Sequence, residues 1–305
     1  NVPLEYPTGI PKPEKNANTP PGKSSAPKNS EKKHDTHKEH SAPESHTRHE
    51  EPPVSSSLIP APIAGLYETT AKGDLLPVIR HDGLRPYHAY KRPFVHTDNK
   101  PLIAIVIDNV GLSPNLNNFM LEKLSPNITI LLSPYTEDSE KIQKAIRESG
   151  HEFWLKLPLE REQFPFSEPG PKGILSRVAM QQNMDNLIWT LSRTSGYAGV
   201  TASTDLSSLK ARPLLNEVMR TIFTKGLGYF ETNPSAPSFF DEIANRHNAP
   251  YLKNEILFSD PKWESSYVEP ADLLERIAES KGYAIGVFPS YSNAIKFIEQ
   301  WSLSL

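Results

Sequence analysis

Short apolar runs alternate with amphipathic segments from about residue 100 to the end of the chain. Six runs rich in β-branched, leucine and aromatic residues predict strands at 102–107, 128–133, 152–158, 197–203, 227–232 and 283–290, and a weaker run lies at 251–258. Helical patterns lie between them, at about 114–124, 136–149, 181–194, 211–225, 236–247, 268–281 and 291–304. This alternation predicts an α/β fold of βα units around a parallel sheet. Seven units favour an incomplete or distorted (β/α) barrel over an open sheet.

The first of these strands ends in two polar residues. The run 102–107 is apolar throughout, which indicates a strand buried on both faces. Asp108 and Asn109 follow it, Gly111 supplies a turn, and Ser113 can cap the next helix. Parallel α/β folds place binding and catalytic groups at this end of their strands. Asp108 is therefore a candidate site residue, although a plain turn-capping role would also explain it.

Polar residues follow the other predicted strands as well. They are Ser133, Tyr135, Lys156, Glu160, Ser203, Asp205, Glu231, Thr232 and Asp260. Because the carboxyl ends of parallel strands meet at one edge, these side chains predict a polar ligand-binding mouth with several carboxylates and one lysine. Local roles remain as alternatives, because Lys156 and Glu160 can form an ion pair and Asp205 can cap a turn.

The first 60 residues have a different composition. Between Pro11 and Pro53 there is no Val, Ile, Leu, Met, Phe, Trp or Tyr, and eleven of the thirty prolines fall in residues 1–60. Such a segment cannot bury enough apolar surface to offset an ordering cost of about 1–2 kcal/mol per residue, so we expect a disordered linker. Eight basic and seven acidic residues in this stretch make a nearly neutral spacer.

Histidines are frequent in this linker. Imidazoles at this density could chelate Zn²⁺ or Ni²⁺ weakly, but an ordinary soluble linker is the favoured explanation. They are His34, His37, His40, His46 and His49.

The segment at 61–100 again contains apolar side chains, in which Tyr87, Tyr90 and Phe94 alternate with basic residues and prolines. We expect an extended arm over 61–100 that packs on a folded domain formed by 101–305.

Composition narrows the class of protein. A net charge of −3 gives no reason to expect a nucleic-acid partner, and the absence of cysteine excludes disulfides and thiolate sites. No apolar run reaches the 18 residues of a membrane span. The first residue is Asn rather than Met, so we expect a signal peptide or a membrane anchor ahead of it, without deciding between them. The last helical pattern reaches Leu305, which leaves open whether a closing strand follows.

Several motifs in one order resemble the divergent polysaccharide deacetylase family. They are IVIDNVGLS at 105–113, ITILLSPYTED at 128–138, GHEFWLKLPLE at 150–160, PGPKGILS at 169–176, GYAGV at 196–200 and GLGYFE at 226–231. Residues 73–94 are similar to the arm that precedes the barrel in longer, alphaproteobacterial-type members. The resemblance implies a distorted (β/α)7 barrel and hydrolysis of an acetyl group on a sugar. In that chemistry a divalent metal, held by aspartate and histidines, polarises the carbonyl and activates water.

The sequence departs from the family at the positions that the resemblance assigns to the metal. The paired aspartates become Asp108 and Asn109, and Lys156 stands where a histidine precedes the LPLE segment. Ser203 replaces a histidine of an NNHMGS-like motif, and Glu231 replaces an aspartate. An ammonium at position 156 would repel a metal ion. We therefore expect the usual metal site to be absent and no cofactor to be needed.

Two hypotheses follow. In the first, the chain is a non-catalytic module of the cell envelope, periplasmic or anchored to a membrane and facing the periplasm. It would bind an envelope glycan or an envelope protein through Asp108, Asn109, Lys156 and neighbouring residues, which are Tyr135, Ser203, Asp205 and Glu231. In the second, it is an active deacetylase in which Asp108, Asp205 and Glu231 hold a hard divalent cation such as Mg²⁺ or Mn²⁺, and Glu160 is the general base.

Overall fold

The computed structural model describes residues 58–96, 99–161, 164–205, 210–237, 239–260, 263 and 266–305. All of them belong to the second of two units into which the chain divides, Pro52–Leu305. The predicted linker up to residue 57, with its histidines, lies outside the described residues. Residues 58–305 are therefore the part of the chain from which the site is built.

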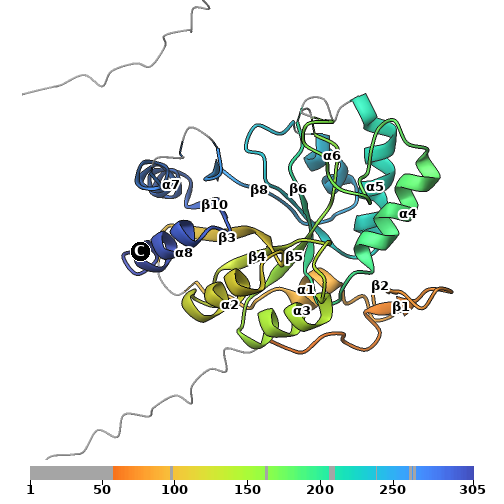
Figure 1. Ribbon diagram of the computed structural model, residues 1–305, viewed down its shortest axis with the longest axis horizontal. Helices are drawn as coiled ribbons and strands as arrows, with labels where there is room; N and C mark the ends of the chain where they lie inside the picture. Colours follow the sequence, from red (N-terminus) through yellow and green to blue (C-terminus); the bar gives the residue numbers. More distant parts are fainter. Residues whose placement is uncertain are drawn as a thin grey trace, which may run out of the picture. The chain divides into compact units, whose positions relative to one another are not determined.

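Eight parallel strands form a curled sheet at the centre of the described part (Figure 1). They are β3 (Leu102–Val110), β4 (Thr129–Leu132), β5 (Phe153–Lys156), β6 (Gly199–Ala202), β7 (Gly228–Glu231), β8 (Tyr251–Lys253), β9 (Ile256–Leu257) and β10 (Tyr283–Pro289). Their order is β8-β7-β6-β5-β4-β3-β10-β9. All seven predicted strand regions are present, and the weak run at 251–258 forms two short strands.

The two edges of this sheet are consecutive in the chain. β8 pairs with β7 and β9 pairs with β10, and Asn254 and Glu255 join them. The Asn254 N–H donates to the carbonyl of Glu231 in β7, and the Glu255 N–H donates to the carbonyl of Ile285 in β10. One segment therefore bridges both edges, and the eight short strands make a distorted barrel of seven strand positions. The predicted fold class is confirmed.

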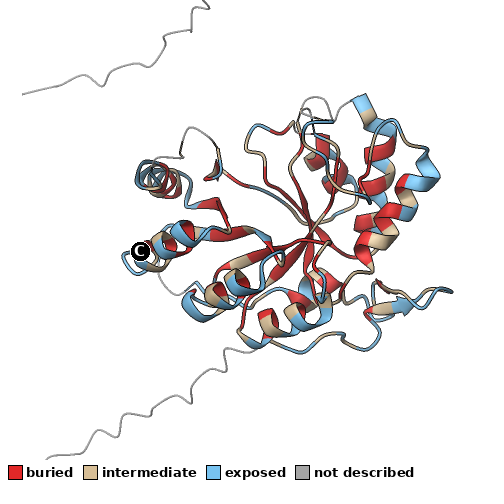
Figure 2. Ribbon diagram, viewed as in Figure 1, coloured by how far each residue is buried: buried red, intermediate tan, exposed pale blue. Residues whose placement is uncertain are grey.

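Seven helices follow the strands and form an outer layer (Figure 1). They are α2 (Pro114–Lys123), α3 (Ser139–Glu148), α4 (Met180–Leu191), α5 (Arg212–Thr224), α6 (Phe239–Arg246), α7 (Val268–Lys281) and α8 (Ser292–Trp301). Their buried sides face the sheet (Figure 2), where they pack on fully buried strand residues such as Ile107, Ile130 and Phe153. None of the described helices has the length and apolar character needed to cross a membrane.

The inner face of the sheet is filled at the amino ends of the strands. Alternate strand residues, among them Val106, Leu131 and Trp154, form a second cluster together with Leu66 and Tyr90 of the preceding segment. That segment contains a small hairpin of β1 (Tyr67–Thr69) and β2 (Leu75–Pro77), and the short helix α1 (Pro86–Tyr90). The amino end of the barrel is thereby filled with apolar side chains.

A buried arginine holds this segment on the barrel. Arg147 of α3 is 2% exposed, and its guanidinium donates to the carbonyls of Ile59, Tyr90 and Gly196 at 2.8, 3.2 and 3.0 Å. It also lies over the ring of Tyr90 at 5.2 Å. Phe94, in contrast, is 63% exposed. Since the amino end is covered in this way, the carboxyl end of the barrel is where a ligand can enter.

Candidate functional site

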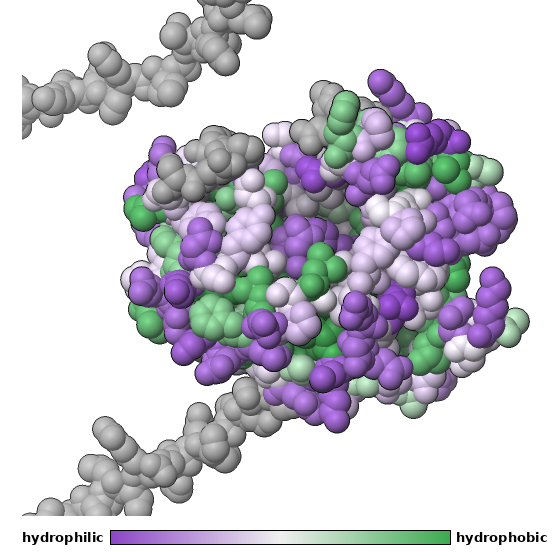
Figure 3. All heavy atoms as spheres, in the orientation of Figure 1, coloured by the Kyte–Doolittle hydropathy of each residue, from purple (hydrophilic) through white to green (hydrophobic). Residues whose placement is uncertain are grey.

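A cleft of about 810 Å³ opens at the carboxyl ends of the strands. Figure 3 shows this face hollowed near its centre, with hydrophilic residues inside and less polar ones around it. Eight of the residues expected from the sequence line it, namely Asp108, Asn109, Ser133, Tyr135, Lys156, Ser203, Thr232 and Asp260. The volume is typical of a site for a small molecule. Residues that were far apart in the chain therefore meet as expected from parallel strands.

Asp108 and Asn109 both reach the cleft because β3 contains a bulge. Ile107 pairs with Ile130 and Val110 pairs with Leu132, so three steps along β3 match two along β4. Asn109 takes up the extra residue with a φ of 60°, a left-handed conformation that asparagine tolerates. Ile107 and Val110 are both buried in the outer core. The two residues between them consequently present their side chains to the same side, which a regular strand would not allow.

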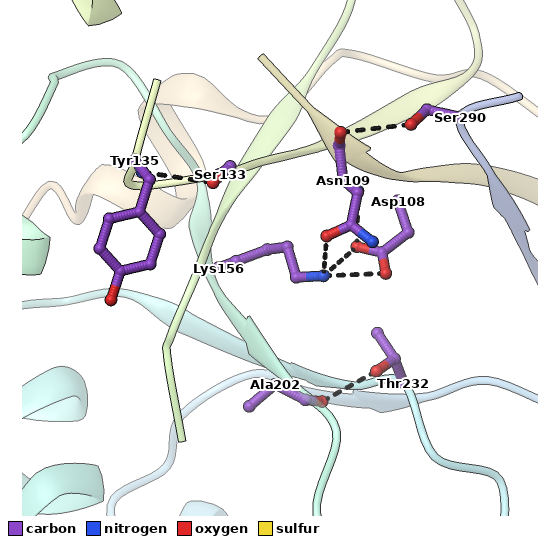
Figure 4. Close-up of polar contacts among 8 residues, drawn as sticks. All are labelled: Asp108, Asn109, Ser133, Tyr135, Lys156, Ala202, Thr232 and Ser290. Carbon is purple, nitrogen blue, oxygen red and sulfur yellow. Dashed lines mark hydrogen bonds and ion pairs between the residues drawn. The ribbon is translucent and has the colours of Figure 1, made fainter. Parts of the chain in front are cut away.

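Lys156 lies at the floor of the cleft and binds both of these side chains (Figure 4). Its Nζ is 2.7 and 2.9 Å from the two carboxylate oxygens of Asp108, and 2.6 Å from Oδ1 of Asn109. The two charged side chains are 25% and 19% exposed, so the pair is largely shielded from solvent. Asp108 also accepts from the Asn109 N–H at 2.8 Å, so the simple turn-capping role exists beside the ion pair.

Tyr135 forms one wall and is fixed in place. Its hydroxyl donates to the carbonyl of Pro169 at 2.8 Å and accepts from the Lys172 N–H at 3.2 Å. Ser133 accepts from the Tyr135 N–H at 3.2 Å. Arg193 donates to the carbonyls of Pro134 and Thr136, which anchors the same turn. This wall is therefore preformed.

Other lining residues were not expected from the sequence. Tyr291 after β10 and Leu112 after β3 lie at the opening and are 62% and 58% exposed. Glu168 and Pro169 come from the loop between β5 and α4. The Pro- and Gly-rich sequence PGPKG at 169–173 was the available signal for this loop, because such composition is typical of a loop that lies across a surface.

Glu231 lies outside this lining. It is fully buried, and four donors surround its carboxyl group: the N–H groups of Thr204 at 3.1 Å and Asn233 at 2.8 Å, the Thr204 hydroxyl, and the Tyr229 hydroxyl at 3.1 Å. Burial raises its pKa to about 7, and the hydrogen bonds oppose that rise. Its role in the structure is to join the loops after β6 and β7, which carry Ser203 and Thr232 to the cleft.

Glu160 and Asp205 also lie outside the lining. Glu160 accepts from the N–H and the hydroxyl of Ser176 at 2.5 and 3.1 Å, and it borders a separate hollow of about 210 Å³. Asp205 follows Thr204 at the edge of the described residues. Lys156 therefore pairs with Asp108 rather than with Glu160. The structure brings Asp108, Asn109 and Lys156 together, and leaves Glu160, Asp205 and Glu231 apart from them.

The residues present do not fit a divalent metal ion. Within the described ranges, no three His, Cys, Asp or Glu side chains lie close enough together to hold one. His151 is fully buried and its Nδ1 contacts the carbonyl of Ile128 at the amino ends of β4 and β5, away from the cleft, while His247 packs on Phe223. The carboxylate of Asp108 is already neutralised by the ammonium of Lys156.

Comparison with known proteins assigns the family. The profile of divergent polysaccharide deacetylases matches residues 105–305. The crystal structure of ATU2773 from Agrobacterium tumefaciens C58, described as an uncharacterized protein, has 31% identity and a TM-score of 0.70, and the match covers 76% of this chain and 94% of that one.

More distant structures include two carbohydrate esterases. The family 4 pseudoenzyme BA3943 of Bacillus anthracis has 13% identity and a TM-score of 0.37, covering 68% of this chain and 60% of that one. PdaA of Bacillus subtilis, a family 4 carbohydrate esterase, has 11% identity and a TM-score of 0.35, covering 78% and 88%. These two likenesses are too distant to bear on the site, and no curated protein matches the chain. On the profile match and the 31% identical structure, the chain belongs to the divergent polysaccharide deacetylase family.

Proposed function

We propose that this protein is a binding module of the cell envelope, which holds a glycan in the carboxyl-end cleft without hydrolysing it. The single observation that carries the proposal is the ammonium of Lys156, which is bound to Asp108 and Asn109 at the floor of the cleft. Metal-dependent deacetylation needs an open coordination position for water beside its metal. An ammonium in contact with these oxygens occupies the place where a metal ion and its bound water would have to lie.

The rest of the cleft supports a glycan as the ligand. Tyr135 and Tyr291 offer aromatic faces for the CH groups of a sugar ring, and Ser133, Ser203 and Thr232 line the same space with polar groups. The Asp108–Lys156 pair has no net charge. Beside it, the side-chain amide of Asn109 is fixed by its bond to Lys156. Together with the charged Arg161, Glu168 and Asp260 of the lining, these groups suit a polar, hydroxyl-rich ligand.

Titration with a soluble N-acetylglucosamine oligomer, followed by calorimetry or NMR shifts, tests the binding. We expect Tyr291→Ala to weaken binding about tenfold, because the ring loses its stacking contact. Tyr283→Ala is the matched control, since Tyr283 is 55% exposed and begins β10, the strand that Tyr291 follows. Equal affinity of both variants and the wild type, or no binding at all, would contradict the glycan proposal.

A separate experiment tests the proposal that the protein does not hydrolyse the glycan. We expect no acetate from the same oligomer, with or without added Zn²⁺, Mn²⁺ or Mg²⁺, at enzyme concentrations stoichiometric with the glycan. Metal-dependent acetate release would instead establish the second hypothesis, the rearranged deacetylase. The envelope location rests on the predicted spacer in residues 1–60, and fractionation of cells expressing the full gene tests it.

A further inference from the structure

We propose that the floor of the cleft is a built-in cation site which the ammonium of Lys156 fills permanently, and which takes up a small organic ammonium ion when that side chain is shortened. The proposal deepens the proposed function, because it explains how a cleft of this family keeps its shape without a metal. Its biological meaning rests on that function, but its test needs no glycan.

The ammonium of Lys156 has oxygen partners on both Asp108 and Asn109. Three oxygens converge on it, two from Asp108 at 2.7 and 2.9 Å and one from Asn109 at 2.6 Å (Figure 4). A lysine ammonium has three N–H donors, and charge-assisted N–H···O bonds have lengths of about 2.7–2.9 Å. Nζ donates to Oδ2 of Asp108 and to Oδ1 of Asn109, and Oδ1 of Asp108 lies within ion-pair distance. The side chain therefore serves as the counter-ion of Asp108.

The backbone that carries these oxygens, and one of the oxygens itself, are held by groups other than Lys156. The bulge in β3 turns Asp108 and Asn109 to the same side, and the Asn109 N–H donates to Oδ1 of Asp108 at 2.8 Å. Ser290, after β10, donates to the Asn109 carbonyl at 3.2 Å, and the Gly111 N–H donates to Oδ1 of Asn117 at 3.0 Å. Since this support comes from β3, β10 and α2, we expect the oxygen cluster to persist when the lysine side chain is truncated.

The cluster suits an ammonium ion better than a divalent metal. Zn²⁺ and Mg²⁺ require ligand distances of about 2.0–2.2 Å, and Ca²⁺ takes six to eight oxygens at about 2.3–2.6 Å. Here two side chains supply three oxygens, and no further His, Cys, Asp or Glu among the described residues completes a metal-binding group. One positive charge with N–H donors matches one carboxylate and one amide oxygen.

The test is chemical rescue of Lys156→Ala. Alanine keeps Cβ, so n-propylammonium replaces the atoms removed. We expect it, at tens of millimolar and constant ionic strength, to raise the thermal midpoint of Lys156→Ala by about 2–4 °C more than that of the wild type. Tetramethylammonium, which lacks N–H donors, should not do so. If the variant is unfolded without amine, recovery of cooperative unfolding on adding propylammonium is the supporting result.

Two controls keep the result specific. Lys156→Met fills the space with an apolar chain, and we expect no rescue of it. Lys144→Ala removes an exposed ion pair, in which Nζ is 3.8 Å from Glu148, and it should respond like the wild type. The proposal is wrong if propylammonium affects all variants equally or fails to restore Lys156→Ala. It is also wrong if micromolar Zn²⁺ or Mn²⁺ restores that variant better than the amine. Failure of glycan binding alone would leave this result unaffected.

Discussion

Replacing Glu231 by glutamine tests whether the buried carboxyl at the end of β7 governs the pH dependence of stability. Its Oε1 accepts from the N–H groups of Thr204 and Asn233, and its Oε2 accepts from the hydroxyls of Thr204 and Tyr229. A glutamine can keep its oxygen at the first position. Its NH₂ can then donate to the two hydroxyls, because a hydroxyl accepts as well as donates. Glu231→Gln should therefore keep the loops after β6 and β7 joined.

The magnitude follows from the shift of the pKa. Burial raises the pKa of Glu231 from 4.5 to about 7, so the folded state binds a proton more tightly than the unfolded state. The contribution of this group to stability is then complete below pH 4.5 and is lost as the pH rises through about 7. Since one pKa unit corresponds to about 1.4 kcal/mol, the loss between those limits is about 3 kcal/mol. Glutamine has no such titration.

Urea unfolding at half-unit steps from pH 4.5 to 8 measures the effect. We expect the free energy of unfolding of Glu231→Gln to gain about 3 kcal/mol relative to the wild type across this range. Glu148→Gln is the control, because Glu148 is exposed on α3, and its curve should run nearly parallel to that of the wild type. Parallel curves for Glu231→Gln as well would refute the reasoning, since the carboxyl would then titrate alike in both states.

Two further substitutions test the support of the cleft and of the amino-terminal segment. Gly111→Ala should destabilise by about 2–4 kcal/mol in urea unfolding, because its φ is +104° and a Cβ would lie 1.9 Å from the Thr136 hydroxyl. Gly73→Ala, with a φ of +87° but open space, should cost about 1 kcal/mol, and equal losses would contradict the steric argument. Arg147→Met leaves two buried carbonyls and one partly buried carbonyl without their donor, so we expect a loss of about 2–4 kcal/mol and faster amide exchange in residues 58–96. Unchanged exchange there would show that other contacts hold the segment.

The fold was predictable because its pattern is strong in all units but the one at 251–258. Apolar strands alternate with amphipathic helices, and each predicted element from residue 100 onward is present. The way in which the barrel closes was not predictable. The weak run at 251–258 gave no sign that its two halves pair with different neighbours, because that division depends on the curvature of the whole sheet.

Part of the site was predictable for the same reason. Parallel strands bring their carboxyl ends together, so Asp108, Lys156 and Ser203 meet in one cleft as expected. The position of a residue near the end of a strand does not, however, decide on which side of the sheet its side chain lies. Glu231 lies one residue before Thr232 and turns into the protein, whereas Thr232 lines the cleft. The facing direction depends on strand register and twist, which the sequence of a four-residue strand does not reveal.

The pairing of Lys156 with Asp108 follows from electrostatics once the geometry is known. A carboxylate that is 19% exposed between less polar walls needs a counter-ion, because an unpaired charge there would be costly. This chain meets that need with a side chain 48 residues away in the sequence. Each replacement alone would leave a charge unbalanced: Asp108 without a cation, or Lys156 without an anion. The pair of Asp108 and Lys156 therefore acts as one unit, which keeps the charge at this point of the cleft balanced.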